Sequence, residues 1–225
     1  MESLALHFCG PLTFAAGENC LFDSPLRDAT CVYLWTIRSD QDYKYYIHYV
    51  GEAMSFAARQ REHLIHILGL NYGVFDAAEA KQGKRALVWK GLWRDGRGRR
   101  RNAEGSKAFY DGPTLALERY AEHSVKVVEY VNAISVFVAK VELDDTRLAA
   151  LRRTPGWDLP DARLQRELRR HLEGKIGWNL RNNHSDAGVL YPPDQHIGTS
   201  VNAMSMRLEL SSDEVIAGLD PAIDV

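Results

Sequence analysis

The chain has few cysteines and no long hydrophobic run. Its three cysteines, Cys9, Cys20 and Cys31, are each eleven residues apart, which matches neither a disulfide framework nor the close pairs of a zinc site. No stretch approaches the ~18 apolar residues of a membrane helix. The first residues, MESLALHFCGPLTFAAGENC, also lack a basic segment followed by a long apolar one. We therefore expect reduced, structural thiols in a cytoplasmic protein that does not contact a membrane.

The chain also lacks a strong excess of either charge. Its formal net charge is -2, so nothing attracts a polyanion to the molecule as a whole. Lys and Arg are nevertheless concentrated in AKQGKRALVWKGLWRDGRGRRRNAEGSK, residues 80–107, where they far outnumber the acids. Any contact with nucleic acid is predicted to be local. With 45% hydrophobic and 26% charged residues, the composition is that of a folded globular domain.

Two aromatic and β-branched segments come early in the chain. CVYLWTI (31–37) and YYIHYVGEA (45–53) are joined by a polar RSDQDYK, a pattern that predicts an antiparallel hairpin. From Ala53 to Leu68 the apolar residues follow helical spacing, with Ala53, Ala57, Leu64 and Leu68 in one arc. We predict an amphipathic helix with Arg59, His63 and His66 on its opposite, cationic face.

The remaining elements are predicted from shorter patterns. VEYVNAISVFVAKVEL (128–143) has the β-branched density of a buried third strand. A second long helix is expected where Leu164, Leu168, Leu172, Ile176 and Leu180 recur at steps of four. PTLALERYAEH (113–123) favours a helix inside an otherwise irregular insertion. SMRLEL (205–210) looks extended, and the Ser211-x-x-Glu214 capping box predicts a short terminal helix.

The order of these motifs resembles the GIY-YIG nuclease family. CVY is followed by YVG and then by FAARQREH, which places Arg59 ten residues after Tyr49 and His63 four residues later. The resemblance implies an α+β fold with a small three-stranded, antiparallel-containing sheet flanked by helices. It covers residues 31–68 closely and 130–183 more loosely. Cys31 departs from the family's usual glycine, and the family's later Asn has three matches, in Asn179, Asn182 and Asn183.

The resemblance also implies a catalytic set. Tyr33, Tyr49, Arg59, His63 and Glu173 are its members, with Glu173 binding Mg²⁺ or another divalent cation such as Mn²⁺. Glu118 competes for the metal-ligand role, but the family order favours Glu173. His63 matches a histidine found in the restriction-endonuclease-like branch. Taken singly, such tyrosines usually pack and such charged residues usually face water, so the interpretation depends on their joint spacing.

Each predicted residue type suits phosphodiester hydrolysis. A tyrosine near an activated water can accept its proton when a cation lies nearby, and a guanidinium can donate two hydrogen bonds to one phosphate. A carboxylate is the ligand that Mg²⁺ prefers. His63 would assist proton transfer or bind phosphate. The other histidines show no zinc-motif spacing.

The basic stretch predicts DNA contact. Arg94, Arg97, Arg99, Arg100 and Arg101 lie in a Gly-containing loop that suits a phosphate backbone, with Trp89 and Trp93 at its base. The bland alternative is a solvated loop without a partner.

We interpret residues 1–225 as a single decorated nuclease domain. Its parts are a 1–30 N-terminal extension, a 31–70 signature hairpin and helix, a 71–127 basic insertion, a 128–185 third strand and Glu-bearing helix, and a 186–225 C-terminal extension. The expected function is an endonuclease, with a restriction enzyme as the first hypothesis and a homodimer favoured by symmetric double-strand cleavage. A repair or mobile-element nuclease, a non-cleaving nucleic-acid-binding protein and a protein-interaction domain are the alternatives.

Overall fold

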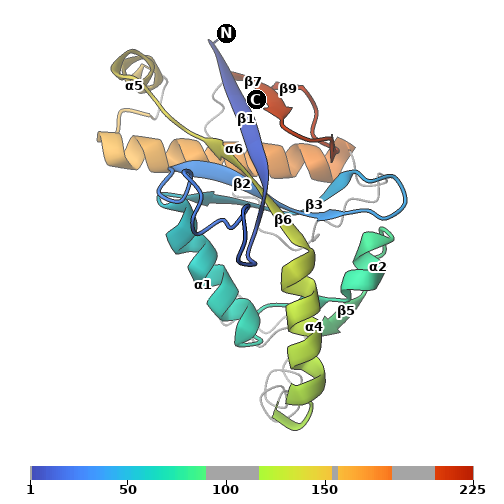
Figure 1. Ribbon diagram of the computed structural model, residues 1–225. Coiled ribbons are helices and arrows are strands. Elements are labelled where there is room, and N and C mark those ends of the chain that lie inside the picture. The colour runs from blue at the N-terminus through green and yellow to red at the C-terminus, as the bar shows by residue number, and fades with distance from the viewer. Residues whose placement is uncertain (1, 90–116, 154–156, 184–205, 225) are drawn as a thin grey trace, which may run out of the picture.

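A curled, mostly antiparallel sheet with helices on both faces organises the computed structural model, which describes residues 2–89, 117–153, 157–183 and 206–224 (Figure 1). The sheet is seven-stranded, in the order β8 (Ile216–Ala217), β3 (Tyr45–Ala53), β2 (Cys31–Arg38), β6 (Ile134–Lys140), β1 (Glu2–Thr13), β7 (Met206–Ser212), β9 (Ala222–Asp224). The α+β class is confirmed. The predicted number of strands is wrong, because segments at both ends of the chain join the sheet.

The predicted hairpin is confirmed in β2 and β3. The strands pair antiparallel from Cys31 opposite Ala53 to Arg38 opposite Tyr45. Strand β2 also pairs with β6 on its other side, so it lies inside the sheet and is buried on both faces. Its residues alternate between two separate cores, as the period of two requires.

Helix α6 (Asp161–Asn183) covers one face of the sheet. Leu164, Leu168, Leu172, Ile176 and Leu180 are all at most 1% exposed and pack against Val32, Leu34 and Phe137 of the sheet, among others. This confirms the helix predicted from the four-residue steps. This aliphatic seam holds α6 against the sheet.

Helix α1 (Phe56–Leu68) covers the opposite face, and here the predicted buried stripe is wrong. The helix buries Phe56, Gln60, His63 and Ile67, whereas Leu68 is 49% exposed. Two polar residues can face the sheet because it offers them partners: Trp35 Nε1 donates to Gln60 Oε1 at 2.8 Å, and Tyr33 Oη lies 2.7 Å from His63 Nε2. The predicted cationic face is wrong for His63.

Residues 128–143 do not form one strand. Helix α4 (Tyr120–Ala133) continues to Ala133, and β6 begins only at Ile134. Val127, Tyr130 and Val131 are spaced as a helical face and pack into the α1-side core. Packing therefore overrides the β-propensity of this valine-rich segment.

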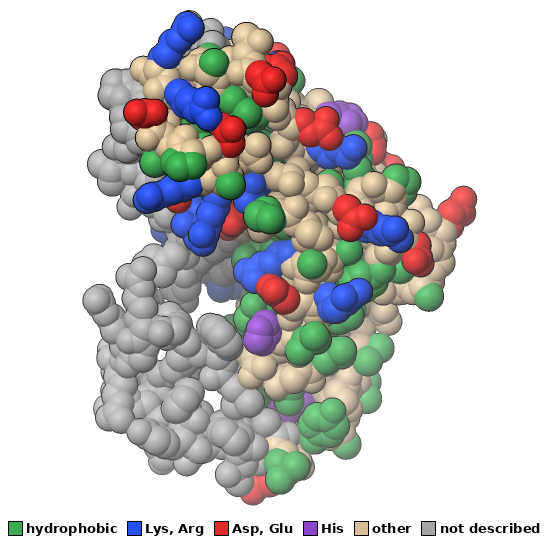
Figure 2. All heavy atoms as spheres, turned by 90° about the vertical axis from the view of Figure 1, so that its left-hand side faces the viewer, with side chains coloured by type: hydrophobic (Ala, Val, Ile, Leu, Met, Phe, Trp, Pro, Cys, Tyr) green, Lys and Arg blue, Asp and Glu red, His purple; other side chains and the backbone are tan. Residues whose placement is uncertain are grey.

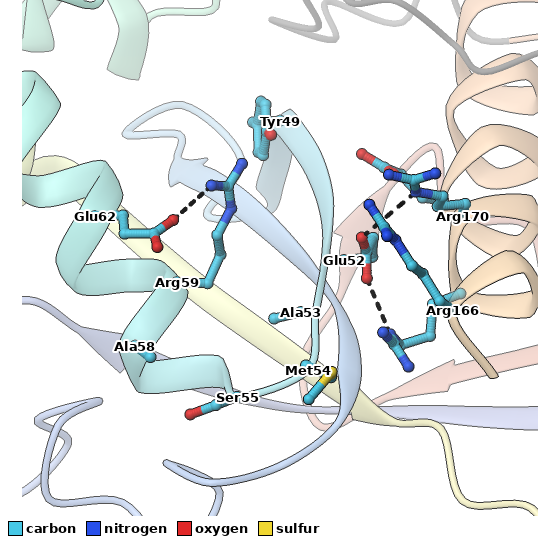
Figure 3. A pocket seen from close by; sticks show the side chains of 12 residues that line it. Tyr49, Glu52, Ala53, Met54, Ser55, Ala58, Arg59, Glu62, Arg166 and Arg170 are labelled. Carbon is cyan, nitrogen blue, oxygen red and sulfur yellow. Dashed lines mark hydrogen bonds and ion pairs between the residues drawn. The ribbon is translucent and has the colours of Figure 1, made fainter. Parts of the chain in front are cut away.

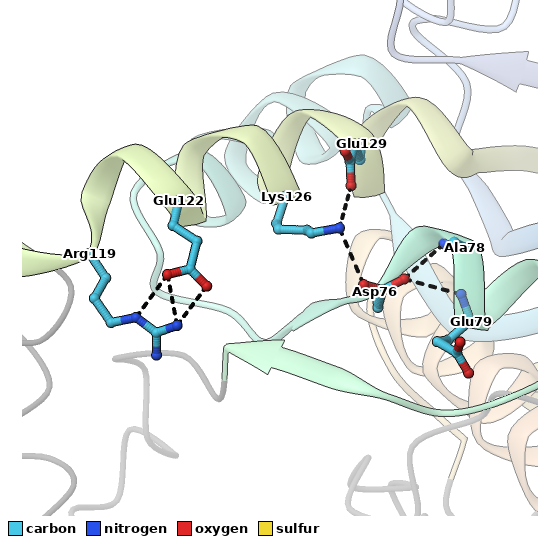
Figure 4. Close-up of polar contacts among 7 residues, drawn as sticks. All are labelled: Asp76, Ala78, Glu79, Arg119, Glu122, Lys126 and Glu129. Carbon is cyan, nitrogen blue, oxygen red and sulfur yellow. Dashed lines mark hydrogen bonds and ion pairs between the residues drawn. The ribbon is translucent and has the colours of Figure 1, made fainter.

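The described residues that follow α1, up to Trp89, pack on the same core. They include β4 (Val74–Phe75), α2 (Ala77–Lys81) and β5 (Leu87–Trp89). Asp76 caps α2 by accepting hydrogen bonds from the backbone of Ala78 and Glu79, and Lys126 of α4 reaches Asp76 at 3.3 Å (Figure 4). Within the helix predicted at residues 113–123, the described residues Leu117 and Glu118 are helical, and α4 begins at Tyr120 after a turn at Arg119.

Both ends of the chain lie side by side in the sheet. Strand β1 pairs parallel with β7, from Glu2 opposite Met206 to Phe8 opposite Ser212. The extended SMRLEL segment is thus confirmed, but the terminal helix is wrong, because Ser211 lies in β7 and is followed by β8 and β9. Along the chain, helix α5 (Asp145–Arg152) follows β6 and precedes α6. Among the described residues no helix is long and apolar enough to cross a membrane.

Candidate active site

A cleft of about 620 Å³ lies at the exposed edge of β3, between α1 and α6 (Figure 3). Among the described residues β8 pairs with β3 at Tyr45 and Tyr46 alone, and the cleft lies along the part of that edge that follows. Its lining comes from three elements: Tyr49, Glu52, Ala53, Met54 and Ser55 from β3 and its end, Ala58, Arg59 and Glu62 from α1, and Arg166, Arg169, Arg170 and Glu173 from α6. The structure therefore brings Tyr49, Arg59 and Glu173 to one place.

A β-bulge turns Tyr49 toward α1. Trp35 pairs with Tyr49 and Thr36 with Ile47, which leaves His48 as an extra residue in β3. Ile47 and Val50 both pack on the α6 side although they are three apart, a spacing that a regular strand does not allow. The bulge thereby places the Tyr49 ring against Tyr33, Trp35 and His63.

Gly51 makes room for the phenol of Tyr33. The two residues are direct partners across the hairpin. A Cβ at Gly51 would lie 2.4 Å from both Cζ and Oη of Tyr33 and 2.8 Å from Cε1 of Tyr49. The Tyr-x-Gly pattern, read in the sequence as a signature, is therefore a packing requirement of the two tyrosines.

Tyr33 is buried behind the cleft rather than in its lining. Its hydroxyl lies 2.7 Å from His63 Nε2, and its ring lies against the ring of Tyr49, with the centroids 6.2 Å apart. Complete burial, followed by the nearby Tyr49, raises the pKa of Tyr33 well above its ordinary value. Tyr33 is thus a neutral phenol that contacts two of the predicted residues, His63 and Tyr49, behind the cleft.

His63 is neutral at physiological pH. Burial first, and then the charges of Arg59 and His66, lower the pKa of His63 to about 3. Among the described residues its Nδ1 atom has no hydrogen-bond partner, and His63 does not line the cleft. The structure thus gives it neither the exposure nor the charge of a phosphate-binding residue.

Arg59 and Tyr49 face each other in the cleft (Figure 3). Arg59 donates to Glu62 at 2.7 Å. Partial burial opposes its charge, but the bond to Glu62 and the facing phenols outweigh burial and raise the pKa of Arg59 above its ordinary value. Burial, followed by the charge of Glu173, raises the pKa of Tyr49 to about 12. Tyr49 is therefore a phenol at neutral pH.

Glu173 carries the most perturbed carboxyl of the cleft. Burial first and the neighbouring Glu52 second raise its pKa to about 7, while Arg59 and Arg170 oppose the shift. A carboxylate that is desolvated and crowded by a second acid gains from a bound cation. Carboxylate and phenol oxygens also match the preference of Mg²⁺ for hard donors. The residues present therefore fit a divalent cation.

The cleft contains charged residues that the sequence analysis missed. Arg169 is 3% exposed and donates from Nε to Glu52 at 2.9 Å, so this ion pair links α6 to β3. Arg166 and Arg170 are exposed on the same helix, and Arg170 Nε lies 4.0 Å from Glu52. Arg170 follows Arg166 by four residues, and Glu173 follows Arg170 by three, so the three side chains lie on one face of the helix. This spacing was the signal available in the sequence.

Several other candidates lie away from the cleft. Glu118 is exposed near the start of α4, and Asn179 donates to Asp220 at 2.7 Å. Asn182 bonds to a backbone oxygen and Asn183 to Asn179. Trp89 donates to the backbone oxygen of Leu70 at 2.8 Å. Glu118 and the asparagines do not line the cleft.

The predicted DNA-binding loop cannot be placed. Arg94, Arg97, Arg99, Arg100 and Arg101, with Trp93, lie outside the described residues. On the face drawn in Figure 2, Lys and Arg side chains of the described residues are mixed with Asp and Glu. The described part of that face therefore presents no purely basic patch.

A second polar cluster joins β1 to β7. His7, Cys9 and Asp213 have potential metal-ligand atoms within 4.8 Å of one another, which sequence spacing missed because Asp213 is distant in the chain. His7 already bonds to Asp213 at 2.8 Å and to Ser211 at 2.9 Å, and Asp213 accepts from the Gly10 backbone. We interpret it as a hydrogen-bonded staple between the two strands. All three cysteines are free thiols, as expected.

Comparisons of this chain with protein-family models, with curated proteins and with solved structures found no match. The functional interpretation therefore depends on the geometry of the cleft and on the motif resemblance alone.

Proposed function

We propose that the protein is a Mg²⁺-dependent nuclease that hydrolyses DNA phosphodiester bonds in the β3 edge cleft. The observation that carries this proposal is the convergence of Tyr49, Arg59 and Glu173 on one cleft from a strand and two separate helices. Glu173 is more than a hundred positions from the other two in sequence, so local packing does not account for their meeting.

The side chains divide the chemistry between them. Arg59 stays charged at any physiological pH and would hold the scissile phosphate through its guanidinium fork. Glu173, with Tyr49 nearby, would hold the cation, here Mg²⁺ or Mn²⁺. When bound, such a cation supplies Lewis-acid stabilisation of phosphate charge and a more acidic water.

Tyr49 would position the attacking water. As a phenol with a pKa raised to about 12, it offers a hydrogen bond rather than a strong base at neutral pH. Tyr33 and His63 would act behind it, because both rings lie against the ring of Tyr49 and the Tyr33 hydroxyl lies 2.7 Å from His63 Nε2. We therefore assign His63 a positioning role instead of the proton transfer or phosphate binding expected from sequence.

The architecture around the cleft supports the GIY-YIG assignment. Strands β3, β2 and β6 are adjacent and antiparallel, Arg59 lies on the helix after the hairpin, and Glu173 lies on a helix after the third of these strands. A restriction-type endonuclease acting as a homodimer is the specific form we propose, with DNA as the partner.

The direct test is incubation of the purified protein with mixed plasmid and phage DNA in Mg²⁺, with an EDTA control. We expect discrete fragments in wild type, none in EDTA and none with Tyr49→Phe, Arg59→Ala or Glu173→Ala. Tyr46→Phe is the matched control, because Tyr46 lies on the same strand and bonds to Asp42 outside the cleft. Metal-independent cleavage, or cleavage that survives all three substitutions, would refute the proposal.

A further inference from the structure

Helix α6 presents a stripe of charged residues to the cleft. Arg166, Arg170 and Glu173 follow one another at intervals of four and three residues and all line the cleft. At a rise of about 1.5 Å per residue, Arg166 lies roughly 10 Å along the helix from Glu173. The stripe thus continues the cleft away from the candidate catalytic residues toward the helix N-terminus.

The arginines of this stripe differ in how firmly they are held. Arg169 is buried and donates from Nε to Glu52 at 2.9 Å, so its side chain is held by this ion pair. Arg170 lies 4.0 Å from Glu52 and 3.7 Å from Glu167, longer than hydrogen bonds. Arg166 has no ion pair within the described part of the chain, and it is exposed in the lining of the cleft.

The ion pair between Glu52 and Arg169 determines where Arg166 and Arg170 lie. Glu52 is bonded to Arg169, and this pair fixes α6 against the end of β3. Arg166 and Arg170 therefore project from a rigid helix whose other side is the aliphatic seam, at little cost in conformational freedom of the backbone. Planar guanidinium groups so placed suit anionic oxygens that enter the cleft.

We propose that Arg166 and Arg170 form a subsite for the nucleic-acid backbone next to the candidate catalytic site, binding phosphates that flank the one held by Arg59. This inference rests on the proposed function, because the cleft is taken as the entry of the DNA strand. The subsite positions the strand by its backbone and does not read base sequence. Arg169 is a positioning residue within it.

The test measures DNA binding in EDTA, where cleavage does not interfere. A fluorescein-labelled random-sequence duplex of about 20 base pairs is titrated with wild type, with Arg166→Ala/Arg170→Ala and with Arg163→Ala/Arg181→Ala. The last pair removes the same charge from exposed positions of α6 that do not line the cleft. Affinity is measured between about 50 mM and about 200 mM salt.

We expect the cleft variant to bind at least roughly tenfold more weakly and to lose about 2 from the slope of log affinity against log salt, because each phosphate contact contributes about 0.9. The control pair should keep the wild-type slope. In Mg²⁺ the cleft variant should raise KM while kcat stays within about threefold, since Arg59 is intact.

Three outcomes would overturn the subsite: no DNA binding by wild type, an unchanged slope in the cleft variant, or equal losses in both pairs. Displacement of DNA by polyglutamate as effective as by unlabelled duplex would also contradict it. Salt-sensitive binding lost in the cleft variant, together with a wild type that never cleaves, would keep the subsite and refute the nuclease.

Discussion

The two faces of the sheet are built on opposite principles, although β2 serves both. Val32 and Leu34 pack against the leucines of α6 in the aliphatic seam, whereas Tyr33 and Trp35 contact His63 and Gln60 of α1 through hydrogen bonds. The first face contributes area and rigidity. The second contributes specific contacts that fix the rings behind the cleft. Because successive side chains of β2 point to opposite faces, the residues that stabilise the fold are separate from those that shape the site.

A large effect on the site side is expected from Arg59→Lys. Lysine keeps the charge but loses the fork, so cleavage should fall roughly 100-fold or more. The free energy of unfolding should change by less than about 0.5 kcal/mol, because the Arg59–Glu62 pair is largely exposed. Arg61→Lys on the exposed side of α1 is the control in the same cleavage assay. Full activity of Arg59→Lys would show that charge alone suffices.

The aliphatic seam predicts the reverse outcome for Leu172→Ala. This side chain is completely buried, so its truncation should cost about 2–5 kcal/mol of unfolding free energy in urea titrations. Cleavage measured well below the melting temperature should remain within about threefold of wild type. Leu68→Ala, at a position 49% exposed, should change stability by less than about 0.5 kcal/mol. A loss of cleavage as large as the loss of stability would contradict the claim that the α6 face stabilises the fold without shaping the site.

Tyr33→Phe should affect both properties, because Tyr33 belongs to the network behind the cleft. The substitution leaves His63 Nε2 buried without its 2.7 Å partner, which should cost about 1–3 kcal/mol. Cleavage should fall roughly tenfold through misplacement of Tyr49 and Arg59. Tyr43→Phe, at a position 67% exposed, should change neither. An unchanged unfolding free energy in Tyr33→Phe would contradict the hydrogen-bonded network.

The pH dependence of stability offers a finer distinction. The pKa of His63 is about 3 in the folded state and about 6.5 in the unfolded chain. The unfolded state therefore takes up the proton first, and His63 should remove about 2 kcal/mol between pH 7 and pH 5. Glu173, with its pKa raised to about 7, acts in the opposite direction over the same interval.

Comparing variants separates the two titrations. The difference in unfolding free energy between wild type and His63→Gln should change in favour of the variant as pH falls from 7 to 5. Urea titrations at each pH measure it. A difference that does not depend on pH would show that His63 titrates as an ordinary exposed histidine.

The buried face of a helix could be predicted from the sequence where apolar periodicity determines burial. It could not be predicted where burial depends on hydrogen-bond partners. The steps of four from Leu164 to Leu180 predicted α6 because aliphatic residues bury without partners. The buried face of α1 was missed because Gln60 and His63 enter the core only through hydroxyl and indole groups of β2. The positions of apolar residues in the sequence do not show that Gln60 and His63 have such partners.

The cleft was likewise predictable only in part. Tyr49, Arg59 and Glu173 were chosen from motif order, and the structure brings them together. The bulge at His48 and the pair between Glu52 and Arg169 could not be read from local patterns, since each depends on register or on contacts between distant segments. Strand β1 was missed because its pairing with β7 joins opposite ends of the chain.

The most direct test of the account is Glu173→Gln, measured for Mg²⁺-dependent cleavage and for unfolding free energy on the same preparation, with Glu209→Gln on β7 as the control. We expect a roughly 1000-fold or greater loss of cleavage. Stability at pH 7.5 should stay equal or rise, because a neutral amide relieves the repulsion between Glu173 and Glu52. Cleavage within about tenfold of wild type, or a collapse of stability together with activity, would contradict the claim that Glu173 serves the chemistry of the cleft rather than the fold.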